Sequence, residues 1–202
     1  MSAISKILVV LANPEYEQDN RSQVVTNLCK EFMETVQKNG ITVDLIDLYN
    51  DDEFNPVLDP ETKDTKTLEF QIRLRKADMV VFFHPIWWGM VPSILKGFLD
   101  KILNQGFAYS TQKGVTTPLL DEKNALVFAV GEKPSWEIRF MYRDILKTFW
   151  QRIIFATSGL KGRVFYFGSL RSVNQKKIDT WFKKVNKIAE NINSKNDILE
   201  LF

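Results

Sequence analysis

The sequence contains little of what several protein classes require. It has one cysteine, Cys29, and one histidine, His84. An internal disulfide therefore cannot form, and a metal site built from several histidines is excluded. With 27 basic and 25 acidic residues the formal net charge is only +2, so the chain lacks the electrostatic footprint of a nucleic-acid-binding protein. Because no run of about 18 apolar residues occurs, we expect no membrane insertion.

The rest of the composition is that of an ordinary globular protein. The 202 residues are 45% hydrophobic and 26% charged, which fits one domain over residues 1–202. The polar residues 193–202 are expected to form a frayed tail. The first six residues lack the features of a signal peptide, and a single cysteine is typical of a reducing compartment. We therefore expect a cytoplasmic location.

Apolar runs and amphipathic segments alternate along the chain. Strands are predicted over residues 6–12, 41–48, 79–83, 125–130 and 163–167, and helices over 25–36, 68–76, 91–103, 136–155 and 178–192. Residues 50–66 form a polar excursion and residues 106–121 a loop. Regular alternation predicts an α/β fold with a doubly wound, five-stranded parallel sheet. Its strand order is the flavodoxin-like 2-1-3-4-5, with helices on both faces.

Three loops of such a sheet meet where the strand order reverses. Ligands of open α/β sheets bind beyond the carboxyl ends of the strands at this point. In this chain the loops span residues 13–23, 84–91 and 131–136. Neither G-x-G-x-x-G after a strand nor a G-x-x-x-x-G-K-[ST] loop is present, so the common dinucleotide and nucleotide-triphosphate fingerprints are excluded.

The first loop leads into a helix whose N-terminus can hold a phosphate. Asn20, Ser22 and Gln23 offer hydrogen bonds there, and Arg21 offers charge. A simple helix cap by Asn20 or Ser22 explains the same residues equally well.

The second loop contains two adjacent tryptophans between prolines. Trp87 and Trp88 follow a buried strand directly and cannot both face the core. One of them can form the wall of a pocket for a flat ring, or both can belong to an aromatic cluster at a subunit interface. His84, at the end of the strand, is interpreted as structural.

The stretch from His84 to Tyr109, HPIWWGMVPSILKGFLDKILNQGFAY, resembles the flavin-dependent NAD(P)H:quinone oxidoreductase family. The family pattern is Pro-aliphatic-x-Trp, then Pro-x-x-Leu-Lys-Gly-x-x-Asp, then Gly-x-Ala-Tyr. The matching residues are Pro85, Ile86, Trp88, Pro92, Leu95, Lys96, Gly97, Asp100, Phe107, Ala108 and Tyr109. Together with the strand pattern, the resemblance covers most of residues 5–192.

The resemblance implies a flavin beside Pro85, Ile86, Trp87, Trp88 and Gly89, and next to Gly131, Glu132 and Trp136. It implies FAD, with FMN as the alternative, and NAD(P)H as the co-substrate. It also implies a homodimer in which Tyr109 lines the pocket for nicotinamide and a quinone-like acceptor, across the subunit boundary or within one chain. The reaction expected is ping-pong hydride transfer.

The chain departs from the family pattern in the first loop and after the fourth strand. Asn13, which can hydrogen-bond a phosphate but carries no charge, stands where the family has histidine. The segment 20–23 replaces the family's Ser-x-x-Asn, and Gly131-Glu132 replaces a Gly-Gly pair. Loss of the second glycine is expected to constrain φ where the backbone approaches the ring. The carboxylate of Glu132 is expected to disfavour a reduced, negatively charged flavin.

Two other functions fit the same fold. One is a flavin-binding regulatory subunit that docks on a potassium efflux channel and has secondary redox activity. The other is a one-electron carrier, which the paired tryptophans and the absence of net negative charge disfavour. An NAD(P)H dehydrogenase (quinone)-type enzyme is the preferred prediction.

Overall fold

The computed structural model describes residues 3–14, 23–58 and 64–192. Its centre is a parallel sheet of five strands, in the spatial order β2-β1-β3-β6-β7. These strands are β1 (Lys6–Leu11), β2 (Thr42–Asp47), β3 (Met79–Pro85), β6 (Asn124–Val130) and β7 (Lys161–Phe167). Because β6 and β7 are the fourth and fifth strands of this sheet along the chain, the order is 2-1-3-4-5, which confirms the prediction.

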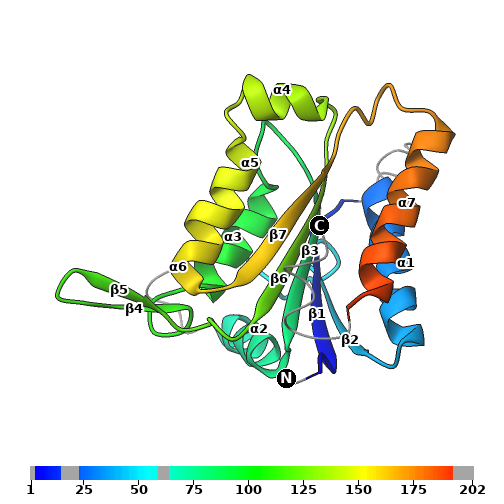
Figure 1. The fold of residues 1–202 in the computed structure, drawn as a ribbon. Coiled ribbons are helices and arrows are strands. Elements are labelled where there is room, and N and C mark those ends of the chain that lie inside the picture. The colour runs from blue at the N-terminus through cyan, green and yellow to red at the C-terminus, as the bar shows by residue number, and fades with distance from the viewer. Residues whose placement is uncertain (1–2, 15–22, 59–63, 193–202) are drawn as a thin grey trace.

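Helices cover both faces of this sheet (Figure 1). One layer contains α1 (Gln23–Lys38) and α7 (Gln175–Glu190). The other contains α2 (Thr65–Lys76), α3 (Ser93–Ile102), α5 (Ile145–Lys147), the π-helix η1 (Thr148–Phe155) and α6 (Ala156–Ser158). The short α4 (Ser135–Phe140) lies above the carboxyl ends of the strands.

The central strands are buried on both faces. All seven residues of β6 are buried, and so are the last five of β1. Their side chains divide between two hydrophobic clusters, one under each helical layer. Phe83 and Phe128 stack across β3 and β6 with ring centroids 4.8 Å apart. These strands read as continuous apolar runs in the sequence because helices cover both faces of the parallel sheet.

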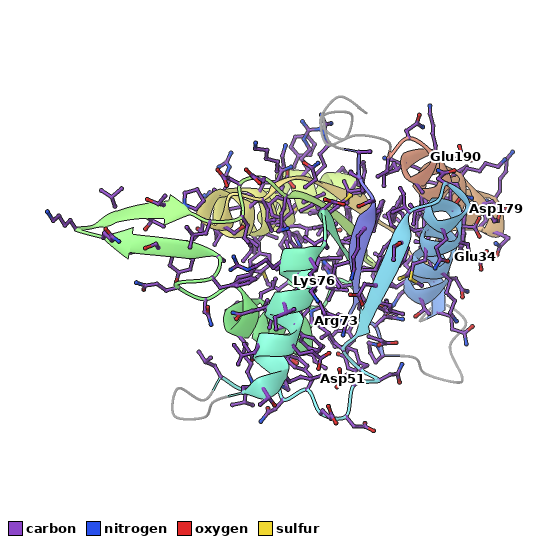
Figure 2. All side chains as sticks on the ribbon, turned by 90° about the horizontal axis from the view of Figure 1, so that it is seen from below. Glu34, Asp51, Arg73, Lys76, Asp179 and Glu190 are labelled. Atoms are coloured by element: carbon purple, nitrogen blue, oxygen red, sulfur yellow. The ribbon has the colours of Figure 1, made fainter. Side chains whose placement is uncertain are left out.

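Charged side chains lie on the outside of the two helical layers. Figure 2 shows Glu34, Asp179 and Glu190 pointing away from the sheet on α1 and α7, with Lys76 on the α2 side. Of the helices in the described ranges, none combines the length and the apolar character that crossing a bilayer would require.

The segment predicted as a loop over residues 106–121 contains a β-hairpin. Its strands are β4 (Tyr109–Gln112) and β5 (Val115–Pro118), and it projects from the body of the molecule (Figure 1). The Leu120 N–H donates to the Ser158 carbonyl at 2.9 Å, just before β7 begins. The base of the hairpin is therefore anchored at the amino end of the sheet, away from the carboxyl ends of the strands. Short strands of four residues with few apolar side chains gave no sequence signal.

The helix predicted over residues 136–155 is interrupted. α4 ends at Phe140, and Arg143 and Asp144 then take positive φ values of 49° and 51°. Two consecutive left-handed residues end a right-handed helix, and the chain resumes as α5 and η1. The broken segment carries Tyr142 over the carboxyl ends of the strands, where it lines a pocket.

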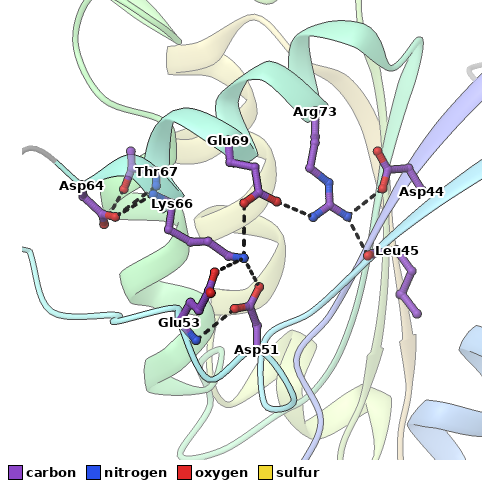
Figure 3. Close-up of polar contacts among 9 residues, drawn as sticks. All are labelled: Asp44, Leu45, Asp51, Glu53, Asp64, Lys66, Thr67, Glu69 and Arg73. Carbon is purple, nitrogen blue, oxygen red and sulfur yellow. Dashed lines mark hydrogen bonds and ion pairs between the residues drawn. The ribbon is translucent and has the colours of Figure 1, made fainter.

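Ion pairs fix the polar excursion to the helices beside it. The Lys66 ammonium contacts Asp51 at 2.9 Å and Glu69 at 3.3 Å, and it also pairs with Glu53 (Figure 3). Buried Lys101 on α3 pairs with Asp64 and donates to the Asn55 carbonyl at 2.7 Å. The described part of the excursion, residues 51–58, is thereby held against α2 and α3.

Gly97 allows the excursion to pack directly on α3. A Cβ at this position would lie 2.6 Å from Pro56 Cβ and closer still to the Pro56 carbonyl oxygen. Helix propensity alone would favour alanine at this position by about 1 kcal/mol. The contact with backbone is the larger effect, because neither partner can rotate away.

We therefore expect Gly97→Ala to lower the free energy of unfolding by about 1–3 kcal/mol, the usual cost of overpacking. Urea denaturation followed by circular dichroism measures this. Ser93→Ala is the matched control, because Ser93 is exposed on the same helix and should change stability by less than about 0.5 kcal/mol. An unchanged midpoint for Gly97→Ala would contradict the packing argument.

Candidate functional site

A pocket of about 1190 Å³ opens at the carboxyl ends of the sheet strands. Many of the residues predicted from sequence line it, namely Asn13, Pro85, Ile86, Trp87, Trp88, Gly89, Gly131 and Glu132. The three predicted loops therefore meet as expected from the strand order. The volume is large enough for a drug-sized ligand and part of a second one.

Pairing of β3 with β6 brings the tryptophan loop to the Gly131 loop. Pro85 lies opposite Val130 in the parallel register, and the Ile86 N–H donates to the Val130 carbonyl at 2.7 Å. The two loops leave the sheet side by side and form adjoining walls of the pocket.

The tryptophan loop is a two-residue reverse turn with a left-handed backbone. Trp87 and Met90 exchange both backbone hydrogen bonds, at 3.0 and 2.9 Å. The central residues Trp88 and Gly89 have φ values of 50° and 78°, as in a type I′ turn. Glycine suits this conformation, but a tryptophan in it is strained by about 1–2 kcal/mol. The Trp88 side chain is fully exposed, so burial does not offset that strain.

The turn and the neighbouring Gly131 loop contain backbone N–H groups with no protein acceptor in the described part of the chain, on residues that line the pocket. Within the part of the chain that the structure describes, the N–H groups of Trp88, Gly89 and Glu132 have no protein acceptor. Backbone donors without an acceptor suit a ligand edge that carries oxygen or unprotonated nitrogen. The donor set and the flat aromatic wall therefore fit a planar heterocycle such as a flavin.

His84 fixes the start of the turn from inside the core. The ring is completely buried, which lowers the pKa of His84 to about 4 and keeps it neutral at pH 7. Its Nδ1 lies 2.8 Å from the Pro85 carbonyl oxygen, so Nδ1 is the protonated nitrogen and donates. The ring packs near Trp150, with centroids 5.6 Å apart. This placement agrees with the structural role predicted for His84.

Asn13 reaches the pocket from β1. Its side chain is buried, and its Nδ2 donates to Thr26 Oγ1 on α1 at 3.0 Å. Val25, in the first turn of α1, also lines the pocket. The start of α1 therefore lies at the pocket, as a phosphate held at the helix N-terminus requires.

The backbone at Gly131 and Glu132 is not constrained in the way that the sequence predicted. Glu132 has no positive φ, so replacing a second glycine does not constrain the backbone. Gly131 is required for a different reason, because a Cβ there would lie 2.5 Å from Tyr166 Oη. Tyr166 donates through Oη to the Lys133 carbonyl at 2.6 Å. Burial, with the charges of Glu137 and Glu132, raises the pKa of Tyr166 to about 12, so the phenol stays protonated.

Several pocket residues were missed by sequence reasoning. Tyr142 lies beyond α4, and Tyr166, Leu170 and Arg171 belong to β7 and the loop that follows it. The predicted strand order could have indicated Tyr166, Leu170 and Arg171, because β7 pairs with β6 in parallel and ends at the same edge. The prediction from sequence covered only the loops after the first, third and fourth strands of the sheet.

Some predicted residues lie outside the pocket. Gln23 begins α1 but does not line it, and Trp136 is exposed on α4 without lining it. Tyr109 lies in the β4–β5 hairpin, which contributes no lining residue. Asn20, Arg21 and Ser22 lie outside the described residues. Over residues 3–14, 23–58 and 64–192, no group of three or more His, Cys, Asp or Glu side chains is arranged to hold a metal ion.

Comparison with known proteins identifies relatives of the whole fold. A family described as having the flavodoxin-like fold matches residues 5–185. A solved NAD(P)H:quinone oxidoreductase from Methanothermobacter marburgensis superimposes with a TM-score of 0.82 at 18% identity. That superposition covers 94% of this chain and 99% of the other, and it concerns the fold alone.

Sequence relatives are oxidoreductases. An uncharacterized NAD(P)H oxidoreductase from Haemophilus influenzae is 36% identical over 129 residues, which cover 60% of this chain. The chain spans only 61% of that relative's length. An FMN-dependent NADH:quinone oxidoreductase from Caldicellulosiruptor saccharolyticus is 29% identical over 140 residues, covering 63% of this chain and 69% of the relative.

The strained turn leads to a prediction about stability. Trp88→Asn creates an Asn-Gly pair, which prefers the type I′ conformation. We expect this variant without ligand to be about 1 kcal/mol more stable in urea denaturation, since relief of strain exceeds the small loss of contacts. Trp87→Asn is the control, because Trp87 has no positive φ and is partly covered, so the same exchange should destabilise. A destabilised Trp88→Asn would show that the turn is not strained.

Proposed function

The chain belongs to the flavodoxin-like fold family, and we propose that it is a flavin-dependent NAD(P)H oxidoreductase that reduces quinone-type acceptors. The observation that carries this proposal is the pocket formed by the Trp87–Met90 turn and the Gly131 loop. It combines free backbone donors, an exposed tryptophan and the N-terminal turn of α1 at the edge where such folds bind ligands. The named activities of the sequence relatives support the same chemistry.

The residues of the pocket have separable roles in this proposal. A bound flavin would supply two-electron redox chemistry between NAD(P)H and a quinone. The N–H groups of Trp88, Gly89 and Glu132 would hold the polar edge of the ring, and Trp88 would form a wall beside it. Asn13 and the start of α1 would hold the phosphate end. Orientation is the main contribution of the protein, because hydride transfer depends on geometry.

We propose FMN as the flavin in place of FAD. FAD needs space for an adenosine, which we expect along the first loop, residues 13–23, and along the excursion of residues 51–59 after β2. Its described residues, 51–58, are instead packed on α2 and α3 through Lys66, Lys101 and Gly97, and none of them lines the pocket. The Caldicellulosiruptor relative is named as FMN-dependent.

A homodimer completes the site in this proposal. Apolar side chains are exposed along the segment from α4 to η1, namely Trp136, Phe140, Met141, Tyr142, Ile145 and Ile153. Exposed apolar side chains gathered in one segment favour an interaction site there. Tyr109 begins β4 at the opposite end of the sheet from its own pocket, and its side chain is partly buried against the core of its own chain. In this proposal the part of Tyr109 that remains exposed meets the pocket of a second copy. One pocket then serves NAD(P)H and quinone in turn.

No observation on the described residues favours a channel-docking regulatory subunit or a one-electron carrier. A cytoplasmic location remains a prediction from composition.

The flavin proposal predicts a yellow protein that releases FMN. Mass analysis of the released chromophore identifies it. Trp88→Ala should weaken FMN binding about thirtyfold, corresponding to ~2 kcal/mol for loss of an aromatic wall. Fluorescence titration of the flavin-free protein measures this. Leu68→Ala, at an exposed position on α2 away from the pocket, should bind FMN like the wild type, and a wild type with no affinity for any flavin would overturn the proposal.

The shared pocket predicts ping-pong kinetics with Tyr109 acting in the acceptor half-reaction. Tyr109→Phe should slow quinone reduction about tenfold, equivalent to ~1.4 kcal/mol, because it removes one hydroxyl contact. Flavin reduction by NAD(P)H should change less, and stopped-flow absorbance separates the two halves.

Subunit mixing tests whether Tyr109 acts across the dimer. A heterodimer of Trp88→Ala and Tyr109→Ala chains would contain one pocket with both residues intact and should regain activity that neither homodimer has. Failure of mixing to restore activity, or a monomer by light scattering, would contradict the shared site.

A further inference from the structure

An ion pair crosses the rim of the pocket between two neighbouring strand ends. Glu132 follows β6, Arg171 follows β7, and both line the pocket. Arg171 Nε lies 2.6 Å from Glu132 Oε1. Both backbones are fixed relative to each other, because the Gly131 N–H donates to the Phe167 carbonyl at 2.9 Å and the Leu170 N–H donates to the Gly131 carbonyl at 3.1 Å.

The remaining charged residue that lines the pocket, Lys133, forms an ion pair with another residue. Lys133 also lines the pocket, and its ammonium lies 2.8 Å from the carboxylate of Glu137 on α4. Among the described residues that line the pocket, Glu132, Lys133 and Arg171 are the charged ones. Arg171 is therefore the group that balances Glu132.

Stability alone does not account for this pair. The Arg171 side chain is 74% exposed and that of Glu132 is 51% exposed. Exposed ion pairs contribute about 0–1 kcal/mol to folding, because water screens the attraction and two long side chains lose entropy. A ligand that covers the pocket excludes this water and strengthens every charge interaction within it.

We propose that Arg171 neutralises Glu132 so that the pocket can hold a ring that becomes negatively charged. This inference rests on the proposed flavin-dependent function. The hydride that NAD(P)H would deliver carries two electrons and one proton, so a ring held here would gain one negative charge and the nicotinamide one positive charge. An unpaired carboxylate at Glu132 would oppose that charge, and the guanidinium of Arg171 cancels the opposition.

Arg171 is in this scheme a positioning residue that acts through Glu132. In this scheme the ion pair offsets the lowering of the flavin potential that is expected from Glu132. The pair also keeps the Glu132 side chain directed toward β7. Neutralising Glu132 and orienting its side chain both change the charge next to the bound ring, and neither is needed for folding.

The test is a double-mutant cycle at Arg171 and Glu132 in which the flavin reduction potential is measured. In Arg171→Gln the unpaired Glu132 should disfavour the reduced flavin about tenfold, a lowering of ~30 mV for a two-electron couple. Glu132→Gln leaves Arg171 unpaired and should shift the potential in the opposite direction. The double variant should return close to the wild-type value. Potentials are measured by equilibration with reference dyes.

A binding measurement gives an independent readout. By linkage, Arg171→Gln should weaken binding of reduced FMN about tenfold and leave binding of oxidised FMN nearly unchanged. Lys96→Gln is the matched control, because it breaks an exposed ion pair with Asp100 on α3, away from the pocket. It should leave both affinities and the potential unaltered.

The outcomes separate this inference from the proposed function. If the wild type binds FMN and is reduced by NAD(P)H, but all three pocket variants keep its potential, the charge-balance inference is wrong and the proposed function stands. If the wild type binds no flavin, both are wrong. Circular dichroism and urea midpoints close to wild type confirm that the variants are folded.

Discussion

Pairing of β3 with β6 is the interaction on which the site depends. Both strands are buried on both faces, so their side chains can only pack, and polar chemistry is confined to the strand ends. The register that places Pro85 opposite Val130 makes the tryptophan loop and the Gly131 loop leave the sheet together. β7 continues the same arrangement and adds Tyr166 and Arg171 to the same edge. A slip in this register would separate the walls of the pocket.

Backbone strain lies at the carboxyl end of the sheet, next to the pocket, and the stability of the buried strands compensates for it. Trp88 occupies a backbone conformation that suits glycine, and its side chain remains in solvent. A residue that weakens the fold and projects over a pocket is typical of a binding site. Buried His84 donates to the carbonyl of the following residue, Pro85, and Gly131 gives Tyr166 the space to approach. The pocket is thus prepared before any ligand arrives.

The regions outside the sheet decide how large a ligand and which neighbours the site can have. Ion pairs of Lys66 (Figure 3) and Lys101 hold the described part of the excursion after β2 on α2 and α3, and none of its residues 51–58 lines the pocket. The β4–β5 hairpin projects from the body of the molecule (Figure 1), and none of its residues lines the pocket. Apolar residues on α4 and the segment after it are exposed.

The order of apolar runs and amphipathic segments was sufficient to predict the parallel sheet, its strand order and the meeting of three loops, because burial on two faces leaves a direct pattern in the sequence. The Pro-Ile-Trp-Trp segment likewise indicated a pocket wall. The hairpin, the break after Phe140 and the Arg171–Glu132 pair could not be predicted. They depend on contacts between residues far apart in sequence or on left-handed backbone at Arg143 and Asp144, which no local periodicity reports. The sequence by itself therefore determined where the site lies, whereas only the tertiary structure decided which charges meet there, because an ion pair forms between neighbours in space.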